Sequence, residues 1–331
     1  MTTESLPPLV EIAGLAVEYV MRGGRVRALD GVDLRIRMGS SVGIVGESGS
    51  GKSTLGLAIG RMLPTRAERT GGDLRVEGRS VFELSTTALR ELRRDRLGYI
   101  FQNPMTALDP TMRVRQQLER AYPELREPDR ITKLLGEVGL SNVERVAHSF
   151  PHELSGGMAQ RVAIALAVAR KPPVLIADEP TASLDAMVRE EVLAVLFDLK
   201  VRLGTTLILL SHELHAIVKR CEVAAVMYGG RIVEYGAAPL LFERPRHPYT
   251  RALLQAAPGQ ERYGQRLEPI PGGPPALHAS ALGCAFAPRC PFAIERCRME
   301  RPQERLFQGR QILCHRAEDV AESVRVAGGD R

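Results

Sequence analysis

The sequence lacks any long hydrophobic run. A helix that crosses a bilayer needs about 20 consecutive apolar residues, whereas the longest candidate, residues 162–168, is short and is followed by Arg170 and Lys171. The chain is therefore not expected to span a membrane. Its first residues also lack the basic start and apolar stretch of a secretory signal. This predicts a cytosolic protein in which disulfides do not form.

The chain also lacks internal repeats, long heptad segments and an unusual composition. Hydrophobic residues make up 44% and charged residues 25% of the chain, values near those of average globular proteins, which exclude a disordered or fibrous chain. A length of 331 residues predicts one large domain with a smaller appendage. The net charge of +6 fits an anionic partner, although an ordinary surface with a nucleotide site accounts for it equally well.

Short apolar runs alternate with segments of helical period, which is the pattern of an α/β domain with a largely parallel sheet. Three of these runs predict buried strands that are followed at once by polar residues. Since ligands bind at the carboxyl ends of parallel strands, the three ends are expected to form one site. The three runs are residues 42–45, 174–177 and 207–210.

The composition changes after about Tyr249. Prolines and glycines between residues 258 and 275 predict a stiff, irregular linker, and four of the five cysteines follow it. We therefore predict a large domain at residues 1–250, with a mostly helical subdomain at about 84–170, and a small module at 251–331.

Residues 46–53, Gly-Glu-Ser-Gly-Ser-Gly-Lys-Ser, match the pattern G-x-x-x-x-G-K-[ST] between a predicted strand and a predicted helix. Glycines allow a tight turn whose N–H groups bind phosphate at a helix N-terminus. Lys52 adds a positive charge at the β- and γ-phosphates, and the Ser53 hydroxyl can bind Mg²⁺. A chance match is the alternative, but the flanking elements favour a nucleotide site. The residues expected to bind ATP here are Gly46, Ser48, Gly49, Ser50, Gly51, Lys52, Ser53 and Thr54.

Polar residues after the other two predicted strands suit phosphate chemistry. Asp178 is expected to hold Mg²⁺ through water, and Glu179 to act as the general base for the water that attacks the γ-phosphate. The alternative is a strand that runs into a surface turn, which Pro180 would also suit. His212 follows the third strand and is expected to contact the γ-phosphate.

Residues 154–160, Leu-Ser-Gly-Gly-Met-Ala-Gln, resemble the signature LSGGQ of the ABC family. Ser155 and the N–H groups of Gly156 and Gly157 form a second anion-binding helix N-terminus, which in this family acts on ATP held by a partner subunit. The resemblance covers about residues 9–250. It implies a P-loop NTPase fold of ABC type, with a RecA-like parallel-sheet core and a helical subdomain.

The resemblance implies roles for three further residues. Tyr19 resembles the aromatic residue that stacks on adenine, with an exposed strand tyrosine as the alternative. Gln102 resembles the Q-loop glutamine, which contacts Mg²⁺ and the membrane partner and is counted among the catalytic residues. Asp185 resembles the D-loop residue that communicates across the dimer.

Within the family, residues 101–108, the SGGM form of the signature and residues 246–250 resemble the ATPases of oligopeptide and dipeptide importers, especially their D-type subunits. Nickel importers are close relatives. The resemblance implies an ATPase at the cytoplasmic face of the membrane that drives uptake through two polytopic permease subunits. A second, F-type ATPase subunit or a second copy of the chain would complete the dimer, and an extracytoplasmic substrate-binding protein would be an indirect partner.

A soluble ABC ATPase that acts on nucleic acid or ribosomes is the rival class. Chromosome and repair ATPases need a long coiled coil or a large insertion before the signature, whereas only residues 54–153 separate Ser53 from Leu154. Translation-type members usually carry two ATPase domains in one chain. No nucleic-acid partner is therefore expected, and nickel or another small solute is the alternative substrate.

Cys284, Cys290, Cys297 and Cys314 are spaced C-x5-C-x6-C-x16-C, and Cys221 lies apart. In a cytosolic chain such a cluster predicts a metal before a disulfide. Zinc sites favour short C-x2-4-C pairs, and Cys290 precedes a proline, as some iron–sulfur ligands do. The C-terminal regions of peptide-importer ATPases resemble this segment, and some carry a [4Fe–4S] cluster. This resemblance predicts all four cysteines as cluster ligands, with Zn²⁺ or plain buried thiols as alternatives.

Overall fold

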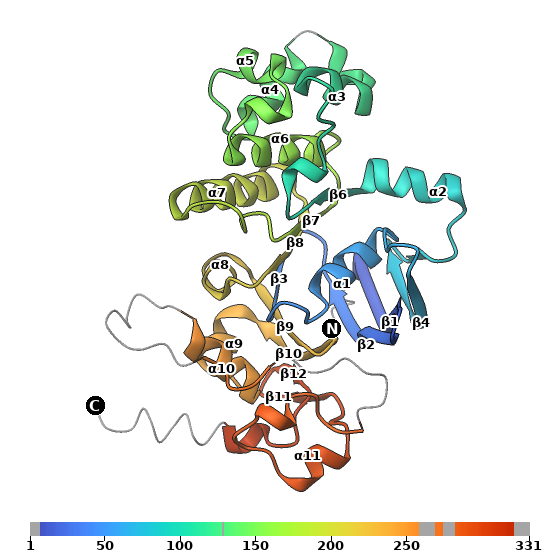
Figure 1. The fold of residues 1–331 in the computed structure, drawn as a ribbon, viewed down its shortest axis with the longest axis vertical. Coiled ribbons are helices and arrows are strands. Elements are labelled where there is room, and N and C mark those ends of the chain that lie inside the picture. The colour runs from blue at the N-terminus through green and yellow to red at the C-terminus, as the bar shows by residue number, and fades with distance from the viewer. Residues whose placement is uncertain (1–6, 128, 258–268, 274–281, 321–331) are drawn as a thin grey trace, which may run out of the picture. The chain divides into compact units, whose positions relative to one another are not determined.

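The computed structural model describes residues 7–127, 129–257, 269–273 and 282–320 (Figure 1). The chain forms two compact units. The first consists of residues 1–37, 41–83 and 210–331, and the second of residues 38–40 and 84–209. Most of the predicted linker lies outside the described residues. No helix in the described part of the chain is long and apolar enough to cross a membrane.

One sheet of the first unit is antiparallel, with the strand order β2-β1-β4-β5. β1 (Val10–Met21) pairs with β2 (Gly24–Ile36) across a tight turn and with β4 (Ala67–Val76) on its other side, and β5 (Arg79–Ser80) ends the sheet. Tyr19 lies near the end of β1. The side chains that form the core of this sheet include Ile12, Leu15, Leu29 and Leu74, all nearly inaccessible.

A second set of strands in the first unit begins at β3 (Ser41–Val45), every residue of which is buried. β3 runs parallel to β9 (Val223–Tyr228), which pairs antiparallel with β10 (Arg231–Ala237). β10 then pairs with β12 (Arg310–Ile312), and β12 with β11 (Arg305–Phe307). Strands from the C-terminal module therefore extend the sheet that contains β3.

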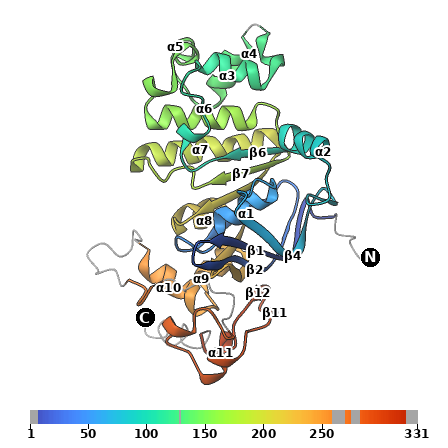
Figure 2. The same ribbon diagram turned by 45° about the vertical axis from the view of Figure 1, so that its right-hand side comes forward.

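Helices of the first unit are mostly short. α9 packs against β9 and β10, and α10 packs against α9 (Figure 1). Figures 1 and 2 both show α11 near β11 and β12. The helices are α1 (Lys52–Ile59), α8 (Leu214–Arg220), α9 (Ala238–Glu243), α10 (Pro248–Ala256) and α11 (Glu295–Met299), with the 3-10 turn η6 (Ala287–Arg289).

A buried ion pair joins the C-terminal module to β10. Glu234 is fully buried and Arg310 is 1% exposed, and their closest side-chain atoms lie 3.2 Å apart. The Glu234 carboxylate also accepts the N–H groups of Arg246 and His247, both at 3.0 Å, and Arg310 donates to the carbonyl of Arg244 at 2.7 Å. These contacts compensate the two buried charges.

The second unit contains β8 up to residue 209, followed across its sheet by β7 and β6. β6 (Leu97–Ile100) and β7 (Val174–Asp178) are parallel, and β8 spans Thr206–Ser211. The three predicted strands are thus confirmed as β3, β7 and β8. The helical interpretation of residues 84–170 is wrong at β6, because a run of four residues is too short to show a period and forms a strand by pairing with β7.

The remaining elements of the second unit are helical, and Figures 1 and 2 both show α6 beside α7. They are α2 (Thr86–Glu91), the π-helix η1 (Leu92–Arg96), η2 (Pro104–Thr106), α3 (Val114–Ala121), η3 (Pro123–Arg126), α4 (Arg130–Glu137), α5 (Val143–His148), η4 (Pro151–Glu153), α6 (Gly156–Val168) and α7 (Ala186–Leu203).

Replacing Arg310→Ala should destabilise the first unit, because the carboxylate of Glu234 would remain buried without its cation. We expect the free energy of unfolding to fall by about 3–5 kcal/mol, as for other broken buried pairs, in denaturant melts followed by fluorescence. Arg305→Ala is the matched control, since its pair with Glu318 is exposed and such pairs contribute about 0–1 kcal/mol. Equal losses in both variants would contradict the role of burial.

Candidate nucleotide site

The phosphate loop, residues 46–53, is shaped by two glycines that accept no side chain. A Cβ on Gly46 would lie 2.1 Å from the carbonyl oxygen of Met227. Gly51 has φ of 105°, and its Cβ would lie 2.5 Å from the carbonyl oxygen of Ala28. Only glycine fits at either place. The loop therefore turns tightly and opens at the N-terminus of α1, where the helix dipole favours an anion.

Lys52 folds back over the loop that precedes it. Its side chain is buried, and its Nζ donates to the carbonyls of Gly46 at 2.8 Å and Glu47 at 3.0 Å and to the hydroxyl of Ser50 at 3.5 Å. The ammonium group thus lies where the phosphates are predicted to bind. Its N–H donors can exchange the carbonyl acceptors for phosphate oxygens when a nucleotide binds.

Other residues predicted for this site lie around α1 or after β8. The hydroxyl of Tyr19 lies 3.3 Å from that of Thr54, and the guanidinium of Arg66 lies 5.8 Å from the tyrosine ring centroid. The structure therefore brings Tyr19 to the helix that follows the loop. Ser53 and His212 are exposed, His212 directly after β8.

In the second unit, the parallel strands β6 and β7 bring four polar side chains together at their carboxyl ends. Tyr99 donates its hydroxyl to Asp178 at 3.1 Å, and Gln102 donates its amide to Glu179 at 3.3 Å. Burial, together with the negative charge of Asp178, raises the pKa of Tyr99 far above its usual value. Tyr99 is therefore a constant hydrogen-bond donor to the carboxylate predicted to hold Mg²⁺.

Glu179 has an unusual backbone conformation. Its φ is 45°, in the left-handed region that residues with a Cβ rarely adopt and that costs about 1–3 kcal/mol. The preceding residue is still in β7, so the chain bends directly after the strand at Glu179. Strain of this kind is concentrated at functional sites, and here it lies at the residue predicted to act as the general base.

The signature segment, residues 154–160, packs against Leu184 and Val188 in the second unit. Ser155 caps α6 by accepting the N–H of Met158 at 3.3 Å. A Cβ on Gly157 would lie 2.6 Å from the Val188 side chain, whereas one on Gly156 would just contact Leu184. Ser155 and Gly156 remain exposed. They present a helix N-terminus to the surroundings, as a site completed by another subunit requires.

The carboxylate of Asp185 has a structural partner in this unit. It caps α7 by accepting the N–H groups of Met187 and Val188, both at 3.1 Å. An N-cap aspartate stabilises its helix by about 1 kcal/mol. Any contact of Asp185 across a dimer would therefore be made by a side chain already held in place.

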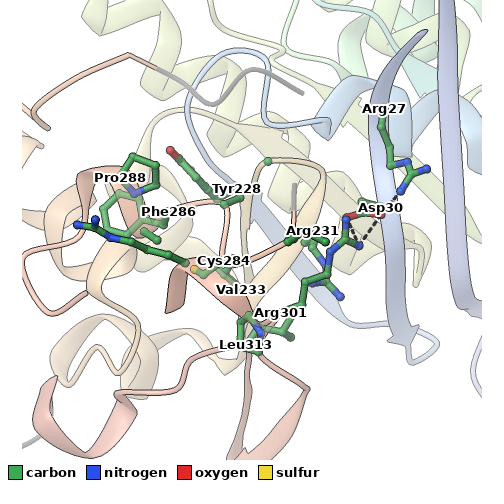
Figure 3. Close-up of a pocket in the computed structure, with 17 residues that line it drawn as sticks. Arg27, Asp30, Tyr228, Arg231, Val233, Cys284, Phe286, Pro288, Arg301 and Leu313 are labelled. Carbon is green, nitrogen blue, oxygen red and sulfur yellow. Dashed lines mark hydrogen bonds and ion pairs between the residues drawn. The ribbon is translucent and has the colours of Figure 1, made fainter. Parts of the chain in front are cut away.

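A cavity of about 360 Å³ in the first unit contains none of the residues predicted to bind ATP (Figure 3). Asp30 lies at its edge and pairs with Arg27 at 3.1 Å and Arg301 at 3.0 Å. Burial lowers the pKa of Arg231 beside them. Cys284 is the one predicted site residue in its lining. The hollow lies between the C-terminal module and residues of β2, β9 and β10, and it is not the nucleotide site.

The four clustered cysteines line a second, much smaller cavity together with His247 and His315. Burial raises the pKa of Cys290 to about 11 and that of Cys314 to about 12, so both thiols are neutral at pH 7. The described residues, which include all four cysteines, contain no group of three or more His, Cys, Asp or Glu side chains that could hold a metal ion. The described side chains therefore do not show the predicted [4Fe–4S] or zinc site.

Sequence patterns do not identify the residues that contact the phosphate loop from outside it. The hydroxyl of Tyr249 accepts the N–H of Glu47 at 2.8 Å, and Arg289 pairs with the Glu47 carboxylate at 2.7 Å. Glu47 is the sequence feature that could have indicated the contact with Arg289, because an acid inside an anion-binding loop needs a cation nearby.

Comparison with known proteins agrees with a nucleotide site at the phosphate loop. Residues 29–182 match the family described as ABC transporter, and residues 233–297 match the family described as oligopeptide/dipeptide transporter, C-terminal region. The chain is 40% identical to the probable peptide ABC transporter ATP-binding protein y4tR of Sinorhizobium fredii, over 94% of this chain and 96% of that protein. It is 38% identical to the oligopeptide transport ATP-binding protein OppD of Salmonella typhimurium, over 92% and 93%.

Solved structures similar to the chain include two of the ATP-binding cassette MJ0796. A dimeric structure of this bacterial ABC transporter cassette has a TM-score of 0.62 at 29% identity, covering 69% of this chain and 98% of the cassette. A dimeric post-hydrolysis state bound to ADP and Pi has a TM-score of 0.61. The fold and the phosphate loop define an ATP-binding cassette. The chain belongs to the family of ABC transporter ATP-binding proteins that carry the C-terminal region of oligopeptide and dipeptide transporters.

Replacing Tyr99→Phe should weaken the binding of Mg²⁺ by about tenfold, because the Asp178 carboxylate loses the hydroxyl donor that orients it. We expect the Mg²⁺ concentration for half-maximal ATP hydrolysis to rise while binding of metal-free ATP is unchanged. Tyr122→Phe removes a hydroxyl that donates to the Leu166 carbonyl in the same unit and serves as control. An unchanged Mg²⁺ requirement in the Tyr99 variant would contradict the role given to Asp178.

Proposed function

We propose that this chain is the ATP-binding and ATP-hydrolysing subunit of an ABC importer that takes up oligopeptides or dipeptides. The observation that carries the proposal is a phosphate loop built for a polyanion, with Lys52 lying over it, in a chain whose relatives over nearly their whole length are named as peptide transport ATP-binding proteins. Mg²⁺ accompanies ATP in this class of ATPase.

Each part of the loop and its surroundings has a proposed role. The residues proposed to bind the phosphates are Gly46, Ser48, Gly49, Ser50, Gly51, Lys52, Ser53 and Thr54, and the hydroxyl of Ser53 binds Mg²⁺. Tyr19 stacks on the adenine. Asp178 holds Mg²⁺ through water, with Gln102 contacting it as well. Glu179 polarises the attacking water, and His212 contacts the γ-phosphate.

A dimer is the proposed working unit. The exposed Ser155 and Gly156, with Gly157, would bind the γ-phosphate of ATP held by the other subunit, and Asp185 would lie at the same interface. Residues 1–250 would form the ATPase domain, with the helical subdomain at about 84–170, and residues 251–331 the C-terminal module. A related F-type ATPase or a second copy of this chain is the partner.

Two permease subunits in the membrane and, indirectly, an extracytoplasmic binding protein complete the proposed assembly. The chain would bind the permeases at the cytoplasmic face of the membrane. Because ATP favours the closed dimer and its hydrolysis removes that preference, the cycle alternates two conformations. Gln102, hydrogen-bonded to Glu179, would link the state of the nucleotide to the permeases. No nucleic acid takes part in this proposal.

Replacing Glu179→Gln should retain MgATP binding and reduce steady-state hydrolysis at least 100-fold, because the amide cannot accept the proton of the attacking water. ATP should then accumulate the closed dimer in size-exclusion chromatography. Glu191→Gln, which removes an exposed carboxylate paired with Arg161 in the same unit, should hydrolyse ATP normally. Turnover near that of the unaltered protein would refute the assignment of Glu179 as base.

We also propose that the four cysteines hold a [4Fe–4S] cluster, which would pin the small C-terminal module. The support is that all four side chains line one cavity and that the N–H of Arg316 donates to the sulfur of Cys314 at 3.3 Å, the kind of bond that stabilises thiolate ligands.

Iron and acid-labile sulfide analysis after anaerobic purification tests this assignment. We expect about four of each per chain, lost in Cys290→Ser and retained in Cys221→Ser, whose thiol lies outside the cavity. Colourless protein with stoichiometric zinc, or with no metal, would exclude the cluster.

A further inference from the structure

Glu47 is a negative charge inside a loop that binds a polyanion. A carboxylate a few Å from bound phosphates repels them by an amount that grows as water is excluded from the site. The loop pattern does not require an acid at this position, since four residues between its glycines are unspecified. Nucleotide affinity therefore depends on what compensates the charge of Glu47.

Arg289 supplies that compensation through a two-pronged contact. Its Nη1 lies 2.7 Å from Oε2 of Glu47, and its Nη2 lies 3.0 Å from Oε1. The arginine side chain is 5% exposed and the glutamate side chain 29% exposed. Such a forked pair fixes orientation as well as charge.

The arginine is itself held on every side by the first unit. Its guanidinium carbon lies 5.8 Å from the ring centroid of Tyr228 and 6.0 Å from that of Phe286, which pack edge to face; Figure 3 shows these two aromatic side chains. Its Nε donates to the carbonyl of Pro271 at 2.7 Å, and its Nη2 to that of Ile270 at 3.3 Å. Arg289 is thus positioned before any nucleotide binds.

Glu47 transmits this position to the rest of the loop. Arg289 binds the carboxylate of Glu47, while the N–H of Glu47 donates to the hydroxyl of Tyr249 at 2.8 Å. The carbonyl of Glu47 accepts a hydrogen bond from Nζ of Lys52 at 3.0 Å. Three groups of one residue are therefore tied to three different partners. A displaced carboxylate would move the carbonyl that orients the phosphate-binding lysine.

Arg289 comes from the turn that carries two of the clustered cysteines. It ends η6 and is followed at once by Cys290, while Cys284 begins the same short segment. The carbonyl of Cys284 accepts the N–H of Ala287, and the N–H of Cys284 donates to the carbonyl of Cys297 at 2.8 Å. The cysteine-bearing segment and the phosphate loop are therefore joined by one side chain.

We propose that Arg289 is a positioning residue for nucleotide binding, through which the C-terminal module neutralises and orients Glu47 in the phosphate loop. The proposal rests on the proposed function of this loop as the ATP site. It assigns the C-terminal module a direct part in ATP binding, because removing the arginine exposes the phosphates to an uncompensated carboxylate.

The test is equilibrium binding of MgATP to the full chain, measured by titration calorimetry for a cycle of variants. Arg289→Gln should raise Kd about tenfold, as expected when one partner of a partly buried pair is removed. The double variant Arg289→Gln with Glu47→Gln should bind within about threefold of Glu47→Gln alone, because the repelling charge is then gone from both proteins.

Arg305→Gln is the matched control, since Arg305 lies in the same module and forms an equally close forked pair, with Glu318 and away from the loop. It should leave Kd unchanged. Melting temperatures of all variants separate weakened binding from partial unfolding. Arg289→Gln with normal affinity would overturn the proposal, and so would a loss that Glu47→Gln fails to rescue, which is the result expected if Arg289 only stabilised the module. Failure of the unaltered protein to bind MgATP would refute the proposed function instead.

Discussion

A loop that binds a nucleoside triphosphate has to bring its backbone N–H groups close to the phosphates. It must do so without placing side-chain atoms or a negative charge in their way. The first requirement is met at Gly46 and Gly51, where carbonyl oxygens of β9 and β2 leave no space for a Cβ. The second is met at Glu47 by an arginine 242 positions further along the chain. The shape of the loop thus depends on strands and a segment that are distant in sequence.

The same constraint gives a physical role to residues 246–250. Glu234 anchors the start of this segment through two backbone N–H groups. His247 accepts the N–H of Tyr249 at 3.0 Å at the start of α10, and burial lowers the pKa of His247 to about 3, which keeps the ring neutral and able to accept. Tyr249 then reaches the N–H of Glu47. Residues 246–250, which resemble the corresponding segment of peptide-importer ATPases, therefore support the phosphate loop.

In the second unit, one hydrogen bond links the residue predicted to activate water to the residue predicted to contact the membrane partner. Glu179 is held in a left-handed conformation after a buried strand, and its carboxylate accepts the amide of Gln102. A movement of the loop after β6 therefore acts directly on the proposed base. Tyr99, on β6 itself, orients Asp178. This four-residue strand and Gln102 in the loop after it therefore contact both carboxylates.

The sequence by itself determined the features that depend on neighbouring residues. Buried strands followed by polar ends, the glycine–lysine loop and the capped helix at Ser155 all follow from local patterns, because strand burial, turns and caps are decided within a few positions. The spacing of Cys284, Cys290, Cys297 and Cys314 predicted a metal site. The four side chains line one cavity, but the described side chains contain no group that could hold a metal ion.

Only the tertiary structure decided the rest. The strand β6 exists because β7 lies beside it, and Tyr99 meets Asp178 across that pairing. Arg289 reaches Glu47 because the C-terminal module lies against the loop, where aromatic rings hold the guanidinium. Contacts between positions so far apart have no period or spacing in the sequence, since they depend on how the folded elements pack.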